Sequence, residues 1–236
     1  MRYTVNRVLA MIKTTKERIN SELSNSDQFI VVAKGQEDNI RGVSINEIER
    51  NIQGRFDKVN ALIDNYIKLK SAVIKSNVGI RDDDSILTTI QVAGKNITMA
   101  ELIDLRDVVY GKNISSRSTE FKVKFLNKLK QDYATAKTTF DFMQKNVDEE
   151  IANYIKALTG NKKDDKDSDG ATKATLDATA DMLHKQKDPK FVDPLKIAEK
   201  IEALEAEIRA FQEESDAEMS TQNALTTIEV DLNDVN

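Results

Sequence analysis

Apolar residues recur at alternating spacings of three and four along three long stretches of the chain. The clearest stretch consists of Leu126, Leu129, Tyr133, Ala136, Phe140, Met143 and Val147. A second runs from Ile197 to Phe211, and a third runs from Ile45 to Val73. Residues three and four apart lie on one face of an α-helix, and a sustained seam of this kind must be covered by another helix. The pattern therefore predicts a protein that is built mainly by helix–helix packing.

Capping residues place the starts of the predicted helices. Ser44 with Glu47, and Thr98 with Glu101, match the capping box that opens a helix. Asp193 is predicted to cap the last helix, with Pro194 as its first residue. The predicted helices cover residues 4–24, 45–77, 98–158, roughly 172–186, and 194–221. The long helix has a weak point at Gly111 and would extend roughly 90 Å if it were unbroken.

Short β-rich runs lie between these helices. Phe29–Ala33 and Ile40–Val43 flank a polar turn with a glycine, which predicts a β-hairpin over residues 28–43. Further strands are predicted at residues 86–92 and 226–231, and their nearly identical sequences TTIQV and TTIEV indicate one small sheet shared with the hairpin. The predicted fold is therefore α+β and mainly α. It is a single elongated domain (1–236), an antiparallel helical bundle or coiled coil with a small β-sheet at one end.

Charge favours the pairing of two of these helices. Residues 112–137 hold seven Lys or Arg against two acidic residues, and residues 199–218 hold eight acidic residues against two basic ones. Opposite charges that flank a helical seam set its register, so these stretches are predicted to cover each other within the chain. The formal net charge of −5 argues against sequence-independent binding to nucleic acid.

The residue types that carry catalysis are scarce. The chain has no cysteine and a single histidine, His184, which is predicted to lie on the surface near the end of a short helix. Residues 160–170, GNKKDDKDSDG, are predicted to form a flexible acidic loop in which Asp165, Asp167 and Asp169 resemble the opening of a calcium loop. Leu176 stands where such a loop needs its bidentate glutamate, so a solvated loop is the favoured interpretation. No enzyme activity, cofactor or metal is predicted.

The hydropathy pattern predicts no membrane insertion. No run approaches the roughly 20 apolar residues of a spanning helix. The amphipathic N-terminal residues lack the apolar core of a signal peptide, which predicts synthesis in the cytoplasm.

Scattered positions resemble the helical family of septicolysin-like proteins. In these proteins a helix ends in asparagine, a short strand and a turn glycine follow, and a new helix starts with a Thr-x-x-Glu-x-(x)-x-x-Arg motif. A closing helix of the D-x-x-(x)-x-x-x-N-x-x-T type comes later in the chain. The matching positions here are Asn77, Gly94, Thr98, Glu101, Arg106, Asp216, Asn223 and Thr226. With its extended middle, the chain looks more like a virion protein of tailed bacteriophages than like the short family members.

The resemblance implies a function without catalysis. We expect a multi-copy structural protein of a phage particle, made in the host cytoplasm and located in the virion, that binds other virion proteins or itself. A membrane-active, septicolysin-like pore-forming protein is the alternative. The residues expected to make protein contacts lie on the distal part of the long helix and on two strand edges: Phe140, Met143, Val147, Tyr154, Ile90, Val92, Ile228 and Val230.

Overall fold

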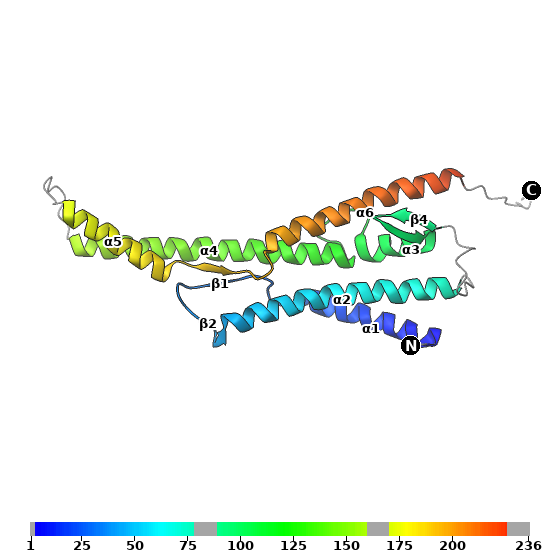
Figure 1. Ribbon diagram of the computed structural model, residues 1–236, viewed down its shortest axis with the longest axis horizontal. Coiled ribbons are helices and arrows are strands. Elements are labelled where there is room, and N and C mark those ends of the chain that lie inside the picture. The colour runs from blue at the N-terminus through cyan, green and yellow to red at the C-terminus, as the bar shows by residue number, and fades with distance from the viewer. Residues whose placement is uncertain (1–2, 78–88, 160–169, 226–236) are drawn as a thin grey trace, which may run out of the picture. The chain divides into compact units, whose positions relative to one another are not determined.

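The computed structural model describes residues 3–77, 89–159 and 170–225 (Figure 1). Over these residues the chain is mainly helical and carries small antiparallel sheets, which confirms the predicted class. Two compact units are formed: one by Met1–Asn25, Lys58–Lys128 and Ile201–Asn236, the other by Ser26–Asp57 and Leu129–Lys200. The prediction of one elongated domain stays a prediction.

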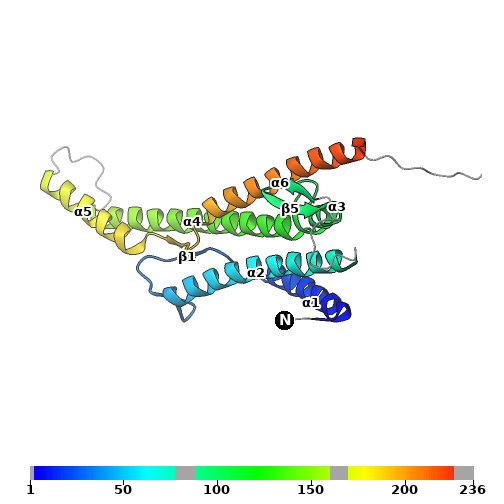
Figure 2. The same ribbon diagram turned by 45° about the vertical axis from the view of Figure 1, so that its right-hand side comes forward.

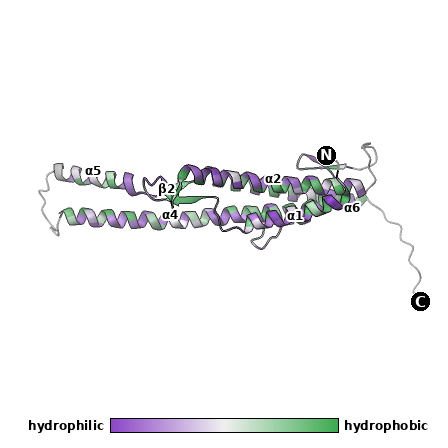
Figure 3. Cartoon of the chain, turned by 90° about the horizontal axis from the view of Figure 1, so that it is seen from below, coloured by the Kyte–Doolittle hydropathy of each residue, from purple (hydrophilic) through white to green (hydrophobic). Residues whose placement is uncertain are grey.

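The bounds of α1 and α2 agree with the predicted ranges 4–24 and 45–77. The helices are α1 (Val5–Ser24), α2 (Ile45–Asn77), α3 (Met99–Asp104), α4 (Phe121–Thr159), α5 (Gly170–Lys187) and α6 (Ile197–Leu225), with the π-helix η2 (Leu105–Tyr110) after α3. The strands are β1 (Val31–Ala33), β2 (Asn39–Ile40), β3 (Val43–Ser44), β4 (Thr89–Val92), β5 (Lys95–Thr98) and β6 (Lys190–Val192). Hydrophobic and hydrophilic residues alternate along α4, as expected for an amphipathic helix (Figure 3).

In the first unit, α1 lies beside the C-terminal part of α2 (Figure 2). Ile19 of α1 and Val59 of α2 are fully buried, so the apolar faces predicted from the sequence do form the core. Tyr66 of α2 is also buried; its ring packs edge-on against Phe121 with centroids 5.2 Å apart. Its hydroxyl donates a hydrogen bond to Asp104, which satisfies the polar end of the side chain.

Of the strand predicted at 86–92, residues 89–92 are observed as β4, which pairs with β5 in an antiparallel hairpin. Residues 86–88 lie outside the described residues. Ala93 and Gly94 form the turn with positive φ angles. At the end of β5, the predicted capping box of Thr98 and Glu101 is present in both directions. Among the described residues, β4 and the Phe29–Ala33 run belong to separate two-stranded sheets, so the sheet expected between them is not seen. The second TTI-x-V strand, at 226–231, lies outside the described residues.

The predicted continuous helix over 98–158 is wrong over residues 111–120, because helical structure stops at Gly111 and resumes at Phe121. Gly111 has φ +72°, a left-handed conformation that ends a helix and favours glycine. In the segment that follows, Ser115 accepts backbone hydrogen bonds from Arg117 and Ser118. Such local bonds compete with helix formation, so α4 begins only at Phe121.

Lys122 of α4 forms an ion pair with Glu207 of α6, which agrees with the predicted charge match. Tyr110 is buried beside them and donates a hydrogen bond of 3.0 Å to the same carboxylate. Burial alone would raise the pKa of Glu207, but the hydrogen bonds from Lys122 and Tyr110 and the charge of Lys122 together lower it. Burial lowers the pKa of Lys122, because desolvation outweighs the opposing effect of Glu207. The interaction therefore positions the two helices at the cost of desolvating a lysine.

In the second unit, the predicted hairpin over 28–43 is wrong in its pairing. β1 pairs with β6, with Val31 opposite Val192. The run Ile40–Val43 is itself a tight turn, because Arg41 and Gly42 both have positive φ angles, as in the two-residue turns that close β-hairpins. It therefore joins the short strands β2 and β3 and leaves β1 free to pair with β6.

A buried carboxylate anchors the segment before β1. Asp132 of α4 is almost fully buried, and its Oδ2 accepts a hydrogen bond of 3.0 Å from the backbone N–H of Phe29. The Phe29 ring is fully buried and lies 4.6 Å from the guanidinium carbon of Arg55. A cation over an aromatic face is stabilising. The segment around Phe29, just before β1, is therefore held to α4 by Asp132 and to α2 by Arg55.

The last helix begins three residues later than predicted. Both carboxylate oxygens of Asp193 accept from the N–H of Ile197, at 3.0 and 2.9 Å. Lys196 has φ +51°, so the residues after Pro194 form a turn and the helix starts at Ile197. Asp193 thus caps the start of the helix as predicted, but Pro194 lies before the helix and is not its first residue. The helix ends at Leu225, beyond the predicted residue 221.

Candidate functional site

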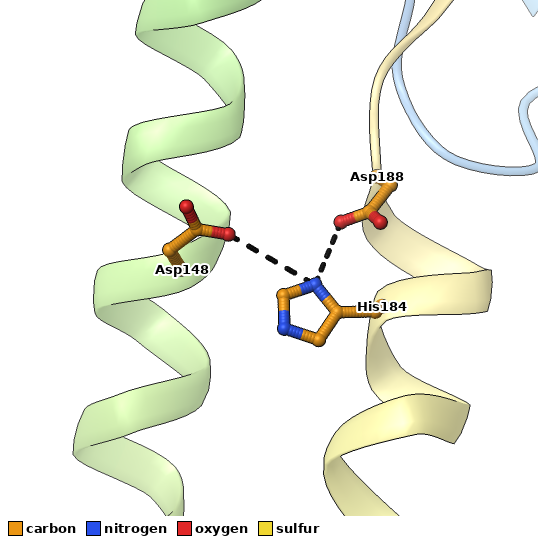
Figure 4. Close-up of side chains that lie close together, drawn as sticks. All are labelled: Asp148, His184 and Asp188. Atoms are coloured by element: carbon orange, nitrogen blue, oxygen red, sulfur yellow. Dashed lines mark hydrogen bonds and ion pairs between the residues drawn. The ribbon is translucent and has the colours of Figure 1, made fainter.

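Four polar side chains meet between α4 and α5 in the second unit. His184 Nδ1 lies 2.9 Å from Oδ1 of Asp188 and 3.9 Å from Oδ1 of Asp148 (Figure 4). The side-chain amide of Gln144 donates to the same two carboxylate oxygens, at 2.8 Å to Asp148 and 2.9 Å to Asp188. Imidazole and amide thus both bridge one carboxylate from α4 and one from the end of α5.

Helical spacing brings these residues together. Gln144 and Asp148 are four residues apart on α4, and His184 and Asp188 are four residues apart at the end of α5, so each pair lies on one helix face. The backbone N–H of Asp188 donates to the carbonyl of His184 at 2.9 Å, which continues the last turn of α5 as far as Asp188. Because α5 lies beside the C-terminal half of α4, the two faces meet (Figure 1).

The carboxylates favour the charged form of the imidazole. The hydrogen bond to Asp188 raises the pKa of His184; desolvation opposes this, and the charges of Asp188, Asp148 and Asp181 add to the rise. Burial alone would raise the pKa of Asp188, but the hydrogen bonds from His184 and Gln144 lower it below its usual range. All three ionisable side chains remain open to solvent.

The donor set determines what this cluster can do. A hydrolytic triad needs a carboxylate on one imidazole nitrogen and a hydroxyl nucleophile on the other. Among the described residues, His184 contacts carboxylates through Nδ1, and no hydroxyl lies within hydrogen-bond distance of its ring. One imidazole nitrogen and two carboxylate oxygens, all within 4.8 Å of one another, can instead hold a cation. The geometry therefore favours cation binding over acyl transfer.

An open cleft of about 370 Å³ lies near the cluster, between the loop after β1, the middle of α4 and the end of α5. Met143 and Val147 form part of its apolar lining. Lys187 and Glu150 line it as well, and they form an ion pair with each other. Two of the residues expected to make protein contacts therefore border a cleft.

The other expected contact residues lie in different surroundings. Phe140 is half-buried, with its ring stacked on Phe191 at a centroid distance of 4.6 Å. Tyr154 is largely exposed, whereas Ile90 and Val92 form the buried face of β4. The remaining sequence candidates lie outside the described residues: Ile228, Val230, Asp165, Asp167 and Asp169. Their assignment to protein contacts or metal stays a prediction.

Sequence reasoning missed the partners of His184. It correctly placed this histidine in the last turn of a helix. Gln144, Asp148 and Asp188 were not singled out, because carboxylates are too numerous in this chain for any pair to stand out. The only sequence signal for these residues is the four-residue spacing of polar side chains on each helix. This spacing identifies a site only when α4 and α5 are known to face each other.

The comparisons with family models, curated proteins and solved structures found no match to this chain. In the described part of the chain, no helix combines the length and the apolar character needed to cross a membrane. Functional inference therefore depends on the residues of the chain itself.

Proposed function

We propose that the chain is a non-enzymatic structural protein, a multi-copy component of a bacteriophage virion. It binds neighbouring virion proteins and copies of itself, after synthesis in the host cytoplasm. An elongated antiparallel bundle or coiled coil, as the seam spacing predicts, is part of this proposal. The sequence resemblance to virion proteins of tailed phages supports the proposed location in a virion. The surface of α4 supports the proposed binding of neighbouring proteins.

The observation that carries the proposal is the exposed end of the α4 seam. Leu129, Ala136 and Ile151 are buried on this side of the helix. Along the same row, Tyr154 and Leu158 are 49% and 55% exposed, and because they lie four residues apart they form one apolar ridge. Contiguous apolar surface of this kind is costly in water and is typical of interaction sites.

The small sheets offer a second route to partners. Each sheet in the described part of the chain has two strands, as in the β4–β5 and β1–β6 pairs. A strand at the edge of a sheet presents backbone donors and acceptors that can pair with another chain. Contacts of both kinds need further copies of this chain or other proteins beside it, and a virion provides both.

The test is the composition of purified particles of the phage that encodes the chain. Quantitative mass spectrometry should find the chain in several copies per particle, and gold-labelled antibody should bind at a fixed position on the particle. If the chain is abundant in infected cells but absent from purified particles, the proposed location and function are wrong.

A further inference from the structure

We propose that Asp148, His184 and Asp188 form a binding site for a divalent first-row transition-metal ion such as Zn²⁺. The three side chains come from α4 and from the end of α5, so a bound ion would tie these two segments together. This inference goes beyond the proposed structural role and does not depend on it.

The separations of the donor atoms fit such an ion. Zinc lies about 2.0–2.2 Å from nitrogen and oxygen ligands, so neighbouring ligands of a tetrahedral ion are about 3.4 Å apart. The distances from His184 Nδ1 to Asp188 and Asp148, 2.9 and 3.9 Å, lie on either side of this value. Since all three donor atoms lie within 4.8 Å of one another, we expect an ion to bind by rotation of the side chains, without movement of the helices.

Gln144 can supply a fourth ligand. Its amide nitrogen lies within 3 Å of both carboxylate oxygens, at 2.8 and 2.9 Å. Rotation of the amide by a half-turn exchanges its nitrogen and oxygen, which then points the oxygen at the same place. In the absence of an ion the amide N–H groups satisfy the carboxylates, and in its presence the amide oxygen can coordinate it.

The imidazole determines which cations are favoured. Calcium and magnesium prefer sites made only of oxygen ligands, whereas imidazole nitrogen suits zinc and its neighbours in the first transition row. The side chains of Asp148, His184 and Asp188 are 55%, 35% and 41% exposed, so an ion can enter from solvent. Lys187, next to Asp188 in the chain, is paired with Glu150, which offsets its repulsion of a cation.

The experiment is calorimetric titration of the full-length chain with Zn²⁺ at about pH 8, above the ordinary pKa of imidazole. We expect one ion per chain in the wild type and affinity at least tenfold weaker in His184→Ala and Asp148→Asn. Asp141→Asn, seven residues before Asp148 on α4, is the matched control and should bind as the wild type does. Gln144→Glu adds a carboxylate ligand and should bind more tightly.

A second measurement does not depend on any variant. Because His184 is the only histidine of the chain, the wild type has a single imidazole whose nitrogen resonances can be followed by NMR. Coordination should shift the Nδ1 signal in step with the calorimetric curve, and excess Ca²⁺ should not reverse the shift. The proposal is overturned if Zn²⁺ leaves this signal unchanged, or if binding is equal in the wild type, His184→Ala and Asp148→Asn.

Discussion

Replacing Phe211 with alanine is expected to lower the free energy of unfolding by about 3–5 kcal/mol. Phe211 of α6 is fully buried, and its ring stacks on Tyr110 with centroids 3.9 Å apart and planes at 12°. Tyr110 in turn donates to Glu207, so the cavity left by the ring would also loosen a partly buried hydrogen bond. Urea-induced unfolding followed by circular dichroism measures the loss.

Phe142→Ala is the control for this substitution. Phe142 is 65% exposed on α4, so the same chemical change removes little buried surface. We expect it to alter the free energy of unfolding by less than about 0.5 kcal/mol. Equal effects of Phe211→Ala and Phe142→Ala would contradict the packing of α6 against the segment around Tyr110.

Gly35→Ala is expected to destabilise the second unit by about 2–4 kcal/mol, because two costs of about 1–2 kcal/mol each add together. Gly35 has φ +53°, a conformation that is strained for alanine. A Cβ atom there would also lie 2.1 Å from the carbonyl oxygen of Gln186, so the loop or the end of α5 must move. The neighbouring Gln36 N–H, which donates to that same oxygen at 3.2 Å, would lose its partner.

Gly42→Ala separates the two costs. Gly42 has φ +83° but no atom within 4 Å of an added Cβ, so only the conformational strain of about 1–2 kcal/mol applies. Chemical denaturation of both variants, with hydrogen exchange to locate the change, makes the comparison. If Gly35→Ala is no more destabilising than Gly42→Ala, the close approach of this loop to α5 is wrong.

The helices could be predicted because their signals are local. Ser44 and Thr98, two of the predicted caps, accept hydrogen bonds from backbone N–H groups three positions away, and Thr4 caps α1 in the same way. The periodic apolar positions of the last seam are also correct, since Ile197, Ile208 and Phe211 are fully buried. Local hydrogen bonds and helical periodicity act over a few residues, so they can be recognised in a sequence without knowledge of the tertiary structure.

The strand pairing could not be predicted in the same way. β1 pairs with β6, which is far away in the sequence, and no local pattern distinguishes this partner from the nearby run Ile40–Val43. The break after Gly111 was recognised only as a weak point, because a single glycine costs a helix about 1 kcal/mol and tertiary packing can offset this. In this chain the local bonds of Ser115 and Ser118 favour the break.

The candidate site depends on the same long-range information. The Lys122–Glu207 ion pair agrees with the match between two oppositely charged stretches, because each stretch repeats one sign of charge many times. The cluster around His184 has no such repetition. It consists of single residues on α4 and α5 whose proximity depends on the register of the two helices, and sequence spacing alone does not fix that register.

The most direct test of the proposed assembly is the molar mass of the full-length chain by size-exclusion chromatography with light scattering. The proposal predicts a mass that is a multiple of 26.6 kDa and rises with protein concentration. Tyr154→Ser and Leu158→Ser should shift this mass towards the monomer, whereas Leu9→Ser, at a similarly exposed position on α1, should not. A wild-type chain that remains at 26.6 kDa at every concentration would contradict assembly through the exposed end of α4.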